Sequence, residues 1–216
     1  MTDLVFLEPN KIDSEPFTTS DIIAGHADIN YRSVQRTIEN QIERLERFGV
    51  MRFEITLPEK GSKGGRPKKV YKLNEQQATL LITFLKNNDK VAEFKVELVR
   101  QFFAMRSELN RRHIERAQLK PIRREMTDVI QQVTDSKWAY KLYTDLSYKL
   151  AVGKIAAKLR EERGAPKNAV AADYMTANEI HDVAELQYRI AVLLEMGMDY
   201  TTVKDTLANR LLLNAS

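Results

Sequence analysis

The chain lacks the residue patterns on which the common catalytic and metal sites depend. Its 216 residues include no cysteine and only three histidines, His26, His113 and His181, which stand far apart in the sequence. Without cysteine there are no disulfides and no thiolate metal sites. The sequence also contains no Gly-x-Ser-x-Gly, no His-Glu-x-x-His and no Gly-x-x-x-x-Gly-Lys-Ser/Thr motif. We therefore expect a protein that is not an enzyme and that holds no cofactor and no metal.

Long apolar runs are missing as well. No stretch of about 18 consecutive apolar residues occurs, so no transmembrane helix and no membrane partner are expected. The first residues, MTDLVFLEPNKID, are acidic and differ from a signal peptide. Together with the missing cysteine, these features predict a cytoplasmic protein. A chain of this length suffices for one large domain or two small ones.

A basic segment is the most informative part of the sequence. Six basic residues and no acidic one lie between Lys60 and Lys72, although the net charge of the whole chain is only +4. Apolar residues alternate with polar ones on both sides of the segment, at Phe53, Ile55 and Leu57 and again at Tyr71 and Leu73. Such alternation predicts a β-hairpin with a long cationic tip.

The tip of this hairpin contains the tract Gly65-Arg66-Pro67-Lys68-Lys69, which resembles the core of an AT-hook. Arginine is favoured in narrow A/T-rich minor grooves because these concentrate negative potential. We expect Arg66 to enter the minor groove, and Lys63, Lys68 and Lys69 to contact phosphates. The alternative is a flexible loop that its lysines keep soluble.

Two helices joined by a tight turn are predicted before the hairpin. The first begins after Thr18 or Thr19 and ends near Gly25, and the second begins after Asn30 and ends at Gly49. Apolar residues of the second helix fall on one side, at Tyr31, Val34, Ile38, Ile42 and Leu45. Polar residues occupy the opposite side, mainly near the start of the helix. They predict DNA contacts at Asn30, Arg32, Ser33, Arg36 and Asn40. An ordinary solvated face is the alternative, and we expect one at Arg44 and Arg47, which alternate with glutamates.

A long helix is predicted from about Asp89 to Ala117, after a helix that Asn74 and Gln77 cap. Its apolar residues form one stripe through Val91, Leu98 and Met105 and a second stripe at Val99 and Phe103. These stripes either pack on the preceding domain or form a subunit interface. The basic end of the helix is expected to be a linker or an exposed end that contacts phosphates, and Pro121 to mark a boundary.

Helical periodicity continues to the C-terminus. One helix is expected from Asp135 or Ser136 to Arg163-Gly164, a second after Thr176, and a third after Asp199. The predicted fold is therefore mainly α with a small β-hairpin. Its domains are an N-terminal winged helix-turn-helix over 1–87, a connecting or dimerisation helix over 88–120, and a helical partner-binding or oligomerisation domain over 121–216.

Several short tracts carry a resemblance to known proteins. They are Thr19-Ser20-Asp21-Ile22, Val34-x-Arg36-x-Ile38, Gly65-Arg66-Pro67, Val70-Tyr71-x-Leu73-Asn74-x-x-Gln77-Ala78-Thr79-Leu80-Leu81, Glu93-Phe94-Lys95 and Phe102-Phe103-Ala104-Met105. Over about residues 17–106 the chain resembles the phage regulatory Rha family, whose members often carry His where this chain has Tyr31. The resemblance implies a winged-helix DNA-binding domain in a regulator of temperate phages, acting in a bacterial host cell.

The C-terminal half resembles the tails of phage antirepressor proteins. The residues that carry this resemblance are Tyr174-Met175-Thr176-Ala177-x-Glu179 and Glu195-Met196-Gly197-Met198-Asp199-Tyr200-x-x-Val203-Lys204. Two functions follow as alternatives. The first is a transcriptional regulator that binds double-stranded DNA as a homodimer or higher homo-oligomer, and the second is an antirepressor whose C-terminal helices bind a repressor protein.

Overall fold

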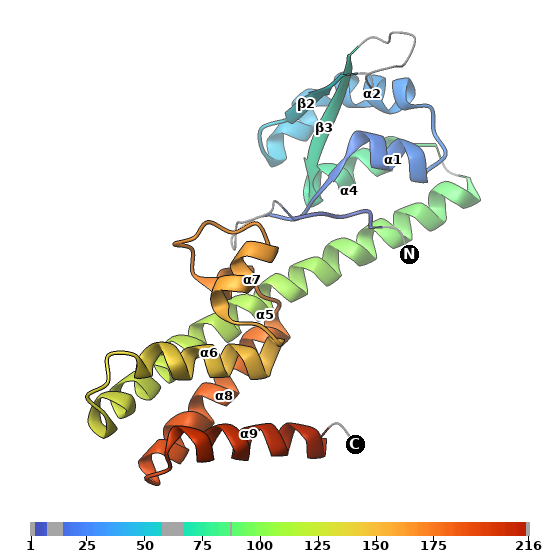
Figure 1. Ribbon diagram of the computed structural model, residues 1–216. Helices are drawn as coiled ribbons and strands as arrows, with labels where there is room; N and C mark the ends of the chain where they lie inside the picture. The colour runs from blue at the N-terminus through green and yellow to red at the C-terminus, as the bar shows by residue number, and fades with distance from the viewer. Residues whose placement is uncertain (1–2, 8–14, 58–66, 87, 215–216) are drawn as a thin grey trace. The chain divides into compact units, whose positions relative to one another are not determined.

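The computed structural model describes residues 3–7, 15–57, 67–86 and 88–214, with side chains up to Asn209. The chain forms two compact units, the first holding the described residues up to Ser107 and the second those from Glu108 on (Figure 1). The division falls inside a single long helix. The domain functions expected for 1–87, 88–120 and 121–216 stay predictions.

The first unit combines a small sheet with helices. Its elements are β1 (Phe17–Thr19), α1 (Ser20–His26), α2 (Tyr31–Asn40), α3 (Ile42–Leu45), the 3-10 helix η1 (Glu46–Phe48), β2 (Arg52–Thr56), β3 (Lys68–Asn74), α4 (Glu75–Phe84) and the first part of α5 (Asp89–Val133). The mainly α fold and the hairpin, here β2 and β3, are confirmed. Two helices followed by a β-hairpin is the element order expected for a winged helix-turn-helix.

The sheet is antiparallel, with the strand order β1-β3-β2. In the hairpin, Phe53 pairs with Tyr71, so the alternating residues do lie opposite one another. The third strand, β1, was not predicted, because three residues are too few to show alternation. Before β1, Phe6 forms an isolated antiparallel bridge with Phe17.

The turn between α1 and α2 differs from the prediction in one respect. Helix α1 continues through Gly25 to His26, and the left-handed residue of the turn is Asp28, with φ of 54°. Aspartate tolerates this conformation better than most side chains. Asn30 caps α2 as predicted, because its side chain accepts a hydrogen bond from the Arg32 N–H.

The helix predicted from Asn30 to Gly49 is interrupted. It breaks at Gln41, whose N–H is shared between the carbonyls of Thr37 and Ile38, as at many helix ends. The stop at Gly49 is confirmed, since φ there is 126°. Amphipathic periodicity runs through the break, so periodicity alone cannot reveal it.

The first unit has a single core to which α5 contributes. Val34, Ile38 and Leu45 from the region after Asn30 are fully buried, together with Leu73 and Leu81. The same cluster contains one stripe of α5, formed by Val91, Phe94, Leu98 and Phe102. Of the two alternatives for this stripe, packing on the preceding domain is the one observed.

The prediction that α5 ends near Ala117 is wrong, because the helix runs through Pro121 to Val133. Proline inside a helix removes one backbone hydrogen bond and strains the preceding turn. Here Leu119 lies before the proline and Met126 and Ile130 lie after it, and all three are buried in the second unit. Tertiary packing on both sides therefore maintains the helix.

The second unit is all-helical, as predicted. Besides the C-terminal part of α5 it contains α6 (Ala139–Val152), α7 (Ala156–Glu162), the 3-10 helix η2 (Ala171–Tyr174), α8 (Ala177–Glu195) and α9 (Tyr200–Asn214). The single helix expected up to Arg163-Gly164 is split, because Gly153 ends α6 in the left-handed conformation, with φ of 73°. The caps predicted at Thr176 and Asp199 are confirmed.

Candidate nucleic-acid interface

One face of α2 is polar and exposed. Arg32, Arg36 and Asn40 recur every fourth residue and therefore line up along the helix, with Ser33 beside them. All four side chains are exposed, whereas Val34 and Ile38 on the opposite face are fully buried. The structure thus brings together the four candidate residues predicted on the body of this helix.

Asn30, the fifth candidate before the hairpin, has a defined structural contact. Its side-chain oxygen lies 2.9 Å from the Arg32 nitrogen and satisfies one of the free N–H groups at the start of α2. The amide NH₂ group remains for other partners, since Asn30 is exposed. Asn30 therefore fixes the first turn, on which Arg32 and Ser33 lie.

The base of the hairpin contacts the start of α2 through Tyr31. The Tyr31 hydroxyl donates a hydrogen bond to the main-chain carbonyl of Lys69. The Lys68 ammonium group lies 3.8 Å from the centroid of the Tyr31 ring, within the range of a cation–π interaction. The Lys68 side chain and the Lys69 carbonyl therefore contact the first residue of α2, which directly precedes the exposed Arg32 in the chain.

Lys69 is held by aromatic rings of the hairpin itself. Its ammonium group lies 4.0 Å from the ring centroid of Phe53 and 4.7 Å from that of Tyr71. Its side chain is only partly buried, so the charge remains accessible from solvent. Phosphate contact by such a lysine would exchange part of a cation–π interaction for a stronger ionic one.

Ser20 completes the polar contacts at this junction. Its hydroxyl accepts a hydrogen bond from the Tyr71 N–H at 3.0 Å and lies 3.3 Å from the Tyr31 hydroxyl. Burial raises the pKa of Tyr31, although the Ser20 contact opposes this, so the Tyr31 hydroxyl remains a donor at neutral pH. Tyr31 was predicted only as an apolar-face residue. The polar end of a tyrosine, which usually finds a partner when buried, was the available signal.

Two candidate residues, Lys63 and Arg66, lie outside the residues that the structure describes. After these residues, Pro67 and Lys68 are both exposed. Of the predicted wing contacts, Lys68 and Lys69 can therefore be placed, and both lie at the base of the hairpin.

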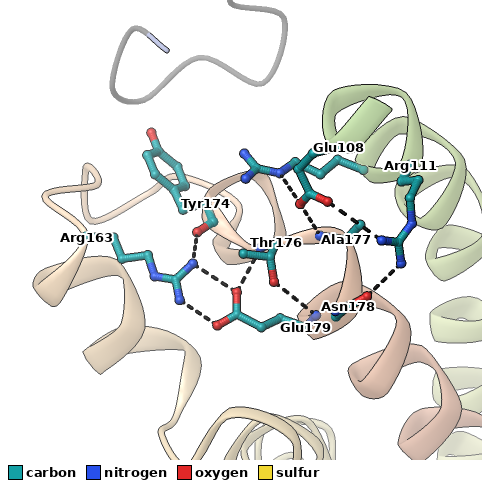
Figure 2. Close-up of polar contacts among 9 residues, drawn as sticks. Glu108, Arg111, Arg163, Tyr174, Thr176, Ala177, Asn178 and Glu179 are labelled. Atoms are coloured by element: carbon teal, nitrogen blue, oxygen red, sulfur yellow. Dashed lines mark hydrogen bonds and ion pairs between the residues drawn. The ribbon is translucent and has the colours of Figure 1, made fainter. Parts of the chain in front are cut away.

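The basic end of the predicted long helix is occupied by contacts within the second unit (Figure 2). Arg111 donates to Asn178 at 2.6 Å, and Arg116 pairs with Asp173 at 2.8 Å. Glu108, which pairs with Arg112, accepts a hydrogen bond from the Ala177 N–H at the start of α8. These arginines therefore hold α8 and η2, which is a structural role, and the expected linker is part of a packed helix.

Among the described residues, no group of three or more histidine, aspartate or glutamate side chains gathers in a way that would hold a metal ion. His181 lies 3.1 Å from the Glu115 carboxylate on the surface of the second unit. Within the same described part of the chain, no helix is both long and apolar enough to span a membrane.

Comparison with known proteins agrees with the resemblance of the N-terminal half. None of the curated proteins matches the chain. The family model described as phage regulatory protein Rha matches residues 18–107, which include the sheet, α1 to α4 and the start of α5. Residues 18–107 of this chain are therefore similar to the phage regulatory protein Rha family.

Proposed function

We propose that the protein is a phage regulator that binds double-stranded DNA through the first unit. The observation that carries the proposal is the junction of α2 and β3, where Lys68 lies against Tyr31, the first residue of the helix that carries the exposed Arg32 and Arg36. Helix-turn-helix proteins use the N-terminal part of their second helix to contact bases in the major groove. The match to a regulatory family over residues 18–107 supports the same function.

Each candidate residue has a role that its chemistry suits. The guanidinium groups of Arg32 and Arg36 can donate to guanine O6 and N7, and the Asn40 amide can pair with adenine. Ser33 can bond either a base or a phosphate. Lys63, Lys68 and Lys69 would hold phosphates, and Arg66 would enter the minor groove. Base contacts then give sequence specificity, and phosphate contacts give most of the affinity.

Selection from a pool of random duplexes tests the proposal directly. The full-length protein is expected to enrich a defined motif over several rounds, whereas an Arg36→Ala/Asn40→Ala variant should enrich none or a degenerate one. The matched variant Arg44→Ala/Arg47→Ala removes two charges after the break at Gln41 and should enrich the wild-type motif. An identical motif from all three proteins would contradict the assigned role of α2.

Regulation by such a protein is expected in the cytoplasm of a bacterial host, with the protein acting as a homodimer or higher homo-oligomer. Two-fold symmetric dimers read two half-sites spaced by about one helical turn of DNA. The motif from the selection experiment would therefore contain an inverted repeat. A single, unrepeated half-site would argue for a monomer on DNA.

A second candidate function is an antirepressor, and exposed apolar residues of the second unit favour it. Trp138 at the start of α6 is 75% exposed, and Leu142, one turn later, is 43% exposed. Large aromatic residues at such positions are typical of protein interfaces. Capture of purified phage repressors by the immobilised full-length protein, but not by a Trp138→Ala/Leu142→Ala variant, would support this function. Equal capture by both proteins would show that Trp138 and Leu142 are not part of the repressor-binding surface.

A further inference from the structure

Among the described strands, β2 lies at one edge of the sheet. In the sheet order β1-β3-β2, the described part of the chain provides β2 with one neighbour, β3. All five residues of β2 are exposed, and two of them, Arg52 and Glu54, are charged, which limits pairing to registers in which these charges are complementary. Native edge strands are commonly protected by such residues or by a bulge, because a free edge presents N–H and C=O groups to other strands.

Exposed apolar side chains are concentrated on and beside this edge. Phe53 is 49% exposed, Ile55 63% and Leu57 72%, and Val50 shortly before the strand is 80% exposed. Phe53, Ile55 and Leu57 alternate along the chain and therefore project from one face. Exposed apolar side chains that share one face of an edge strand in this way are typical of an interaction surface.

We propose that β2 is the self-association surface of the first unit and that it pairs antiparallel with β2 of a second copy. The two-fold axis would pass through Phe53. The partner is a second copy of this chain because, in this one arrangement, the charged residues of one β2 strand lie opposite residues of the other charge in the second β2 strand. The pairing would join two three-stranded sheets into one continuous sheet.

The charges select the register. In a two-fold antiparallel pair, opposite residues have the same hydrogen-bonding parity, so the axis must pass through a residue. An axis through Glu54 would place two glutamates opposite one another, which is destabilising. An axis through Ile55 would give Arg52 and Glu54 no opposite charge. An axis through Phe53 places Arg52 opposite Glu54 of the second copy twice, with the two Phe53 rings face to face across the axis.

The contacts within one copy are compatible with this register. Glu54 pairs with Lys72 at 2.8 Å, yet its side chain remains 67% exposed and can accept a second cation. Arg52 lies directly opposite Lys72 in the sheet. Arg52 already interacts within its own copy, and a carboxylate from the second copy would add to these interactions.

The consequence for DNA rests on the proposed function. A two-fold axis through β2 would relate two copies of α2, so that an inverted repeat would be read by equivalent residues. The self-association itself does not depend on DNA. It can be tested without DNA, and a failure of either proposal leaves the other standing.

Cysteine substitution tests the register, because the natural chain contains no cysteine. Phe53→Cys, Glu54→Cys and Ile55→Cys each place a single thiol at one of the three axes compared above. Under mild oxidation of the full-length protein, Phe53→Cys is expected to form a covalent dimer. The other two should not, because their thiols would be separated by a diagonal or a longer distance. Val50→Cys, exposed but away from the axis, is the control.

A charge exchange tests the pairing without removing an aromatic residue. Arg52→Glu and Glu54→Arg alone would place like charges opposite one another, and the dissociation constant of the dimer should rise about tenfold or more. The double variant Arg52→Glu/Glu54→Arg restores opposite pairs and should recover the dimer. Sedimentation velocity gives the oligomeric state, and thermal unfolding by circular dichroism verifies that each variant is folded.

Three results would overturn the proposal. The first is a wild-type protein that stays monomeric at all concentrations, and the second is a covalent dimer at Ile55→Cys or Glu54→Cys but not at Phe53→Cys. The third is a dimer that Arg52→Glu does not weaken, which would move the interface elsewhere. Anisotropy with DNA, measured separately, then shows whether a monomeric variant still binds.

Discussion

The Lys68 ammonium group lies 3.8 Å from the centroid of the Tyr31 ring, so that the first residue of β3 contacts the first residue of α2. The Tyr31 hydroxyl adds a hydrogen bond to the carbonyl of Lys69. Through these contacts the base of the basic hairpin is joined to the first turn of α2. The proposed DNA binding depends on this junction, because both elements would have to reach the same duplex.

Tyr31→Phe is expected to distinguish the contributions of the two contacts to stability. The ring remains for Lys68, but the hydrogen bond to Lys69 is lost, so stability should fall by about 1 kcal/mol. Tyr31→Ala removes both contacts and buried aromatic surface, and should cost about 3 kcal/mol. Urea unfolding followed by circular dichroism measures both values. Equal losses for the two variants would show that the ring contributes nothing.

Arg36→Ala is expected to weaken binding to the selected motif by about 1–3 kcal/mol and to affect random DNA less, because Arg36 is assigned to a base. Lys68→Ala should weaken binding to both DNAs alike and lower the salt slope by about 1, since it removes one phosphate contact. Fluorescence anisotropy on both duplexes measures the difference. Lys149→Ala, an exposed lysine of α6, is the control and should change neither value.

Gln77→Ala should destabilise the first unit by about 2–3 kcal/mol. The Gln77 side chain completes the capping box with Asn74, and its amide also donates to the Gly49 carbonyl at 2.7 Å. Gln77 is almost fully buried, so its loss leaves these groups unsatisfied. Gln76→Ala, at the exposed neighbouring position, should change the free energy of unfolding by less than about 0.5 kcal/mol. Urea unfolding measures both free energies, and similar losses for Gln77→Ala and Gln76→Ala would contradict the role of Gln77 in the cap.

Acid should destabilise the second unit through Glu108 and Glu179. Burial alone would raise the pKa of each carboxyl group. The Ala177 N–H and Arg112 at Glu108, and Arg163 and the Thr176 N–H at Glu179, outweigh it and lower both pKa values (Figure 2). A lowered pKa in the folded state gives stability that is present above the unfolded pKa, about 4.3, and is lost as the pH falls through the folded pKa.

Glu108→Gln should therefore lower stability at neutral pH and flatten its decline below about pH 4.3. Urea midpoints from pH 7 to pH 3 measure both effects. Glu125→Gln removes an exposed carboxylate of the same helix and should follow the wild-type profile. A Glu108→Gln profile as steep as that of the wild type would show that Glu108 contributes nothing to acid sensitivity.

Signals that lie within a few residues were sufficient to predict much of this fold. The cap at Asn30, the box of Asn74 with Gln77 and the box of Thr176 with Glu179 were predicted and are observed. The break at Gln41 and the continuation of α5 through Pro121 were not, because tertiary packing decides them. The strand β1 depends on β3, whose nearest residue is almost fifty positions away, and three residues carry no pattern of their own.

The candidate site divides in the same way. Helical spacing was enough to place Arg32, Ser33, Arg36 and Asn40 on one exposed face. The contact of Tyr31 with Lys68 and Lys69 joins residues almost forty positions apart, and no local pattern contains it. Arg111 and Arg116 were predicted as part of a linker or exposed helix end, because their partners Asn178 and Asp173 lie much further along the chain.

Salt-titrated fluorescence anisotropy on the motif found by selection tests the central claim most directly. The wild-type protein is compared with Arg66→Ala/Lys68→Ala/Lys69→Ala. Binding by the wild type should fall steeply with salt, and the variant should bind far more weakly, with a slope reduced by about 2 for the two lost phosphate contacts. Wild-type protein that binds no duplex at any salt concentration would contradict DNA binding and leave the antirepressor function as the account of this chain.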